Sequence, residues 1–141
     1  MSKLKPYSTT ILTLCGIIMV GMGLYFVLLR PVLLPEDSRY IGLYVADLQT
    51  TAPNLADWLR RVFTVMGAFM LTTGLLVVYI ARTSFRVKSK GVSAIITVTG
   101  LTSIGLMVIV NFLINSDFKW LLFSIAVLWG IALLLYYFEN R

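Results

Sequence analysis

The chain has 141 residues, of which 59% are hydrophobic and 13% are charged, whereas a soluble domain is about 45–50% apolar and about 25% charged; a bilayer must cover the excess, which predicts an integral membrane protein. The sequence has no histidine and one cysteine, Cys15, which excludes Cys/His metal sites and Cys–His or Ser–His catalytic pairs, so we expect no metal, cofactor or catalytic residue. The net charge is +6, but the basic residues lie beside the apolar runs and form no separate basic domain, which excludes a nucleic-acid partner.

Four uncharged runs are long enough to cross a bilayer, because about 20 helical residues at about 1.5 Å each span a hydrocarbon core of about 30 Å. The alternation of polar and apolar residues that a membrane β-barrel needs is absent from these runs. The predicted fold is therefore all-α, a four-helix integral membrane bundle in which residues 1–141 form a single membrane domain. The predicted spans are residues 8–29, 62–81, 92–116 and 120–138.

Residues 30–61 form the long connection between the first two predicted spans. Asp37 or Ser38 is expected to start a short amphipathic helix that runs to about Gln49 along the membrane surface. Asn54 is expected to cap an extension of the second span.

Small residues recur every seven positions in the first two spans. Gly16 and Gly23 share one face of the first span, and Gly67 and Gly74 share one face of the second. Helices in a bilayer associate by close approach through such small residues. The spacing predicts that these two spans pack antiparallel along the four glycines.

The third predicted span is the most polar, and it carries Asn111 and Asn115 near its end. An amide side chain without a hydrogen-bond partner is costly in hydrocarbon, so this helix is expected inside the bundle. One interpretation is that the two asparagines form interhelical hydrogen bonds. The alternative is that they line an outward-facing polar pocket.

The charges predict the orientation of the chain. Four spans place both termini and the 82–91 connection on one side of the membrane, which carries the whole net charge of +6. The positive-inside rule then predicts cytoplasmic termini and an outward connection 30–61. The basic residues of the first side are Lys3, Lys5, Arg82, Arg86, Lys88, Lys90 and Arg141, and its one acid is Glu139.

A polar cap is predicted at the outer mouth of the bundle, because Arg60 is in heptad register with Gly67 and Gly74. Such a cap could hold a lipid phosphate or a small anion. The alternative is a network of partly solvated ion pairs that pins the loop to the helix ends, with about 0–1 kcal/mol for each exposed pair. The candidate residues are Arg60, Asn111, Asn115, Arg39, Asp117, Glu36 and Asp37.

The residue types leave three classes of function open. No span has an ionisable residue near its centre, which disfavours proton-coupled transport. We therefore expect a non-enzymatic accessory or assembly component, whose partners are membrane lipids and either a second copy of the chain or another membrane protein. The alternatives are a small-solute permease or channel and a lipid-binding or lipid-modifying protein.

The stretch Leu34-Pro-Glu-Asp-Ser-Arg-Tyr-Ile-Gly42, together with the length and the span count, carries a family resemblance. Over its whole length the chain resembles the small bacterial four-helix inner-membrane proteins, DoxX-like families among them. This resemblance implies a multi-pass protein of a bacterial inner membrane. It assigns no activity to any residue.

Overall fold

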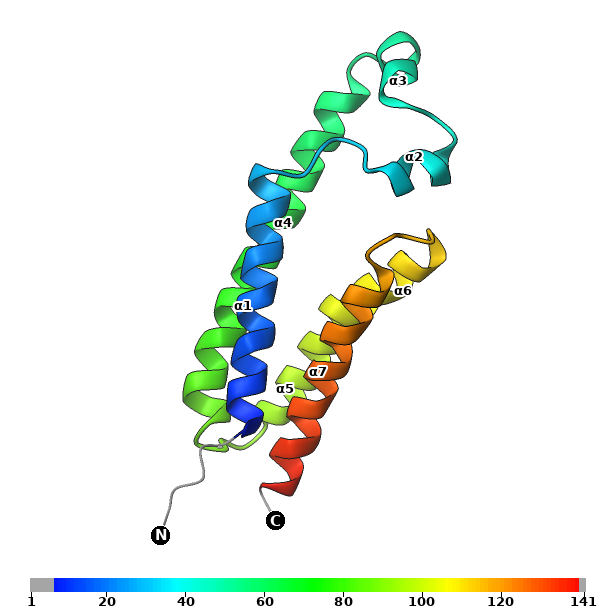
Figure 1. The fold of residues 1–141 in the computed structure, drawn as a ribbon. Helices are drawn as coiled ribbons and strands as arrows, with labels where there is room; N and C mark the ends of the chain where they lie inside the picture. Colours follow the sequence, from blue (N-terminus) through cyan, green and yellow to red (C-terminus); the bar gives the residue numbers. More distant parts are fainter. Residues whose placement is uncertain (1–6, 140–141) are drawn as a thin grey trace.

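A computed structural model describes residues 7–139 of the chain, and within that range all of the regular structure is helical (Figure 1). The helices are α1 (Tyr7–Leu28), α2 (Pro35–Ile41), α3 (Val45–Thr51), α4 (Leu55–Ile80), α5 (Val92–Gly100), α6 (Leu106–Leu113) and α7 (Lys119–Phe138), and the π-helical turns are η1 (Ala81–Phe85) and η2 (Leu101–Gly105). One long helix, α4, ends in a π-helical turn, and another is interrupted by one, between α5 and α6.

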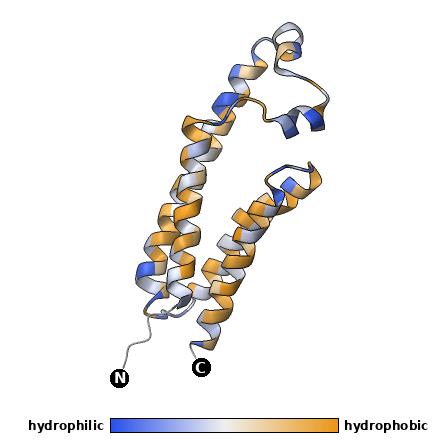
Figure 2. Ribbon diagram, in the orientation of Figure 1, coloured by the Kyte–Doolittle hydropathy of each residue, from blue (hydrophilic) through white to orange (hydrophobic). Residues whose placement is uncertain are grey.

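Within the described range, four continuous helical segments are long and apolar enough to span a membrane, and Figure 2 shows their mainly hydrophobic residues. This confirms the prediction of a multi-pass membrane protein. The second segment extends the predicted span at both ends, and the third stops three residues early, before Asn115, whose φ is +52°. The segments are Tyr7–Leu28, Leu55–Phe85, Val92–Leu113 and Lys119–Phe138.

The α1 and α4 helices form an antiparallel hairpin that is closely packed along its four glycines (Figure 1). Gly16 lies against Gly74, and Gly23 lies against Gly67. A Cβ atom added to Gly23 would lie 2.5 Å from the backbone nitrogen of Leu71, and at each of the four positions it would meet atoms of the opposite helix within 3.0 Å. Only glycine therefore permits this distance between the two backbones.

The buried apolar core lies where all four membrane-length segments meet, mostly toward the end that holds Tyr7, the 86–91 connection and Phe138. We call this the terminal end, and we call the opposite end, with α2, α3 and residues 114–118, the loop end (Figure 1). Toward the loop end α6 tilts away from α1 and α4, and it has no buried residue. The core residues are Leu12, Cys15, Met19, Val77, Ala81, Phe85, Val92, Ile96, Ile104, Leu122, Ile125, Trp129, Ala132 and Tyr136.

Trp129 of α7 is a packing residue in the middle of this core. Its indole ring lies against Gly100, where a Cβ atom would collide with the ring. The indole Nε1 donates a hydrogen bond to the backbone oxygen of Ile96 at 3.2 Å. The missing side chain at Gly100 thus makes room for a large aromatic residue whose polar atom is satisfied inside the bundle.

The connection between α1 and α4 contains two short helices, so the prediction of one helix from Asp37 or Ser38 to about Gln49 is wrong. Gly42, with φ +70°, ends the first helix in a left-handed conformation, which glycine adopts without strain. Asp37 lies inside that helix, and its carboxylate accepts a hydrogen bond from the backbone N–H of Leu34 at 2.9 Å. Asn54 directly precedes α4, as predicted, but its side chain forms no capping hydrogen bond.

Candidate functional site

The most deeply buried cation at the loop end is Arg30, which follows α1. Its side chain is 5% exposed and forms an ion pair with Asp37, with 2.8 Å between Nη2 and Oδ2. The Arg30 Cζ atom lies 3.5 Å from the ring centroid of Phe63 on α4 and 5.2 Å from that of Phe26 on α1. A buried charge requires a close partner, and the aromatic faces supply a second attraction. Arg30 therefore ties the start of the connection to both helices of the hairpin.

Sequence reasoning chose Arg60 for this position and missed Arg30. Both arginines continue a glycine register, since Arg30 lies seven residues after Gly23 and Arg60 lies seven residues before Gly67. Because α1 and α4 are antiparallel, the two glycine registers place both arginines at the same height along the helix pair. Two cations there would repel each other. Arg30 occupies the buried place, whereas Arg60 is exposed and its side chain has no hydrogen bond or ion pair with the rest of residues 7–139. The prediction that Arg60 lies on the packing face is wrong.

The α2 helix is attached to the turn between α6 and α7. Glu36 is 3% exposed, and its carboxylate accepts a hydrogen bond from the Ser116 hydroxyl at 3.2 Å. The Ser116 oxygen in turn accepts one from the backbone N–H of Phe118. Arg39 and Asp117 form an exposed ion pair at 2.7 Å, and this hydrogen-bonded carboxylate raises the pKa of Arg39 above its ordinary value. We call these contacts of α2 the clasp.

The two asparagines of the third span do not join these residues. Asn111 donates a hydrogen bond to the backbone oxygen of Met107, one turn earlier in its own helix, at 2.9 Å. Asn115 lies beyond α6 and accepts a hydrogen bond from Lys119. The predicted interhelical hydrogen bonds of Asn111 are therefore wrong, and neither asparagine forms a hydrogen bond with the Arg60 side chain within the described residues. Glu36 and Arg39 instead hold α2 against Ser116 and Asp117 of the turn between α6 and α7, and Asp37 pairs with Arg30.

At the terminal end, Glu139 joins the two ends of the described chain. Its carboxylate accepts hydrogen bonds from the backbone N–H of Ser8 at 3.2 Å and from the Ser8 hydroxyl at 2.6 Å. Its backbone oxygen accepts a hydrogen bond from Lys88. The carboxylate satisfies a backbone donor that the first turn of a helix leaves free, and its negative charge suits the positive end of the helix dipole.

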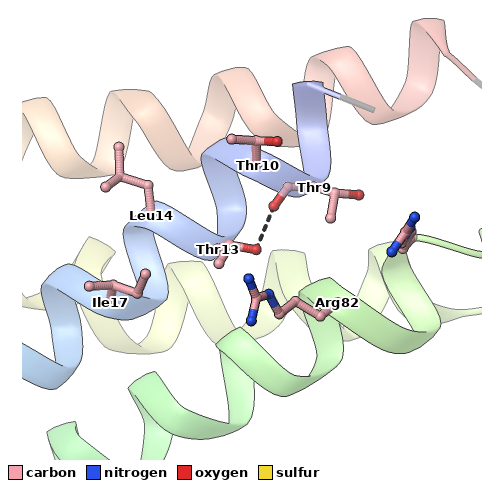
Figure 3. A pocket seen from close by; sticks show the side chains of 7 residues that line it. Thr9, Thr10, Thr13, Leu14, Ile17 and Arg82 are labelled. Carbon is pink, nitrogen blue, oxygen red and sulfur yellow. Dashed lines mark hydrogen bonds between the residues drawn. The ribbon is translucent and has the colours of Figure 1, made fainter. Parts of the chain in front are cut away.

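A groove of about 670 Å³ opens between the first turns of α1 and the basic residues around η1 (Figure 3). Thr9 is only 9% exposed, and its hydroxyl has no hydrogen-bond partner among the described residues. The neighbouring Thr13 hydroxyl donates to the backbone oxygen of Thr9 at 2.7 Å. The lining residues are Thr9, Thr10, Thr13, Leu14, Ile17, Arg82 and Arg86.

The position of Arg82 and Arg86 beside the spans predicts orientation charges and contacts with anionic lipids, but it does not indicate this groove. The spacing of the two arginines across one helical turn could have indicated a shared face. The facing threonines could not, because they belong to a different span. Among residues 7–139 no group of His, Cys, Asp and Glu side chains could hold a metal ion.

Comparison with protein-family models, with curated proteins and with solved structures finds no match to this chain.

Proposed function

We propose that the chain is a non-enzymatic accessory or assembly component of a membrane, and that the connection between α1 and α4 is its docking element for another membrane protein. The observation that carries this proposal is the attachment of α2 both to the α1–α4 hairpin and to the turn between α6 and α7. Arg30 and Asp37 hold its start against α1 and α4, and the clasp holds it against the turn between α6 and α7.

This attached helix and the residues after it present large side chains to the surroundings. Tyr40 is 65% exposed and Tyr44 is 72% exposed, and the apolar residues between them, Ile41 and Leu43, are exposed as well. Tyrosine is enriched in the energetically important parts of protein interfaces. A surface whose backbone is already fixed loses little conformational entropy on binding. These exposed side chains on a fixed backbone are therefore better suited to binding a protein than to anchoring a flexible segment in the membrane.

The orientation of this element is part of the proposal. The excess of lysine and arginine at the terminal end supports cytoplasmic termini, and the neutral loop end then faces outward. We place the protein in a bacterial inner membrane, as its overall plan implies. The docking partner would accordingly be reached from the outer side of that membrane.

Site-specific photo-crosslinking in intact cells tests this proposal. A photoreactive phenylalanine analogue at Tyr40 or Tyr44 is expected to give a protein adduct of defined mass. The control is the same analogue at Tyr79, which is equally exposed but belongs to the membrane-spanning part of α4. Adducts with lipid alone at Tyr40 and Tyr44 would contradict the proposal, and adducts between two copies of the chain would replace the proposed partner by self-association.

A further inference from the structure

We propose that the groove between α1 and η1 binds the phosphate headgroup of an anionic phospholipid from the leaflet at the terminal end. This site is independent of the docking element, because it lies at the opposite end of the helices. It combines two cationic side chains, a buried hydroxyl that has no partner among the described residues, and an apolar continuation.

The cationic part of the groove consists of Arg82 in η1 and Arg86 directly after it. Both side chains are exposed, and neither forms an ion pair or a hydrogen bond with another described residue. The one acid on this side of the chain, Glu139, is already engaged by Ser8. Two arginines one helical turn apart are thus left for an external anion. The planar guanidinium group matches the oxygens of a phosphate with paired hydrogen bonds.

The opposite wall of the groove supplies neutral hydrogen-bonding groups. Figure 3 shows Thr13 of α1 facing Arg82 across the groove, with Thr9 beside it. The Thr9 hydroxyl is the observation that points to a ligand, because a buried hydroxyl normally has a hydrogen-bond partner and this one has none among the described residues. Because Thr9 lines the groove, a rotation of its side chain about χ1 would let a phosphate or glycerol oxygen in the groove provide that partner.

The apolar part of the groove distinguishes a lipid from a free phosphate ion. Leu14 and Ile17 continue the α1 wall from the threonines toward the middle of the span, and both are exposed. A groove of about 670 Å³ is also much larger than a single phosphate group needs. A polar, cationic end at the membrane surface followed by aliphatic side chains corresponds to a headgroup followed by an acyl chain.

Native mass spectrometry of the full chain in a neutral detergent tests the proposal. The probes are phosphatidylglycerol, phosphatidylcholine and inorganic phosphate, each titrated separately. We expect phosphatidylglycerol to bind about tenfold more tightly than phosphatidylcholine, and we expect Arg82→Gln to remove most of this difference. Lys90→Gln is the matched control, since it removes one exposed positive charge from the same end outside the groove, and it is expected to leave the difference unchanged.

Thr9→Val keeps the proposal testable if Arg82→Gln does not fold. This nearly isosteric change removes a hydroxyl that has no partner in the described structure, so the chain should fold normally and bind phosphatidylglycerol several-fold more weakly. Thr72→Val is its control, because the Thr72 hydroxyl bonds to its own helix at Ala68, outside the groove. Equal effects of Arg82→Gln and Lys90→Gln, an unchanged affinity in Thr9→Val, or inorganic phosphate that competes fully with the lipid would each overturn the proposal.

Discussion

Arg30 is the side chain on which the loop end depends most. It is buried against two aromatic rings, Phe63 and Phe26, and paired with Asp37. The heptad spacing of the glycines predicts a cation just beyond the Gly23–Gly67 contact, but it does not decide whether that cation is Arg30 or Arg60. That choice depends on where the chain turns, because the connection after α1 folds back and brings Asp37 onto Arg30. The acid that selects the buried arginine therefore could not be identified from the spacing of the spans.

Replacement of Arg30 by glutamine is expected to lower the free energy of unfolding by about 3 kcal/mol, because it removes the cation that is paired with Asp37 and that lies against the two rings. Arg60→Gln is the control and is expected to change the same free energy by less than about 0.5 kcal/mol, since its side chain is exposed and has no partner among the described residues. Unfolding in mixed micelles with increasing dodecyl sulfate measures both. Equal effects of the two variants would show that Arg30 is not the buried anchor.

The α1–α4 hairpin is the element that the sequence predicts best. The length of an apolar run and the seven-residue spacing of glycines can both be read within one span. In a bilayer the first determines that the run forms a membrane-spanning helix, and the second gives that helix a close-packing face. The connection was harder to predict, because Gly42 divides it into two helices by adopting a positive φ. The π-helical turns η1 and η2 were not predicted at all, since their sequences contain no residue that requires such a turn.

Gly23→Ala is expected to destabilise the hairpin by about 1–3 kcal/mol, since the new methyl group would lie 2.5 Å from the backbone of α4. Gly21→Ala is the matched control in the same helix, where an added Cβ meets nothing within 4 Å. Its stability should be unchanged or slightly higher, because alanine is the better helix former. The same unfolding titration measures both variants, and a comparable loss in Gly21→Ala would contradict the close packing of α1 on α4.

The molecule as a whole combines a packed terminal end with a loop end held by the Arg30–Asp37 pair and by the clasp. The core residues and the Ser8–Glu139 contact join the helices near the termini, whereas α6 contributes no buried residue. The predicted cap does not join Arg60 to Asn111: Arg60 is exposed and its side chain has no partner among the described residues, and Asn111 bonds within its own helix. The hydropathy of each span contains no information about how the helices pack, because packing involves residues of different helices, such as Trp129, whose ring lies against Gly100.

We expect four helices to cross the membrane, which would place the terminal end and the loop end on opposite sides of it. Single cysteines at Thr50, Ser89 and Phe118, in a chain with Cys15→Ala, can be tested with a membrane-impermeant maleimide on intact cells. Thr50→Cys and Phe118→Cys are expected to react from outside, and Ser89→Cys only after the membrane is permeabilised. Reaction of Ser89→Cys and Thr50→Cys from the same side would contradict the membrane crossing of α4, and with it the account of both ends of the molecule.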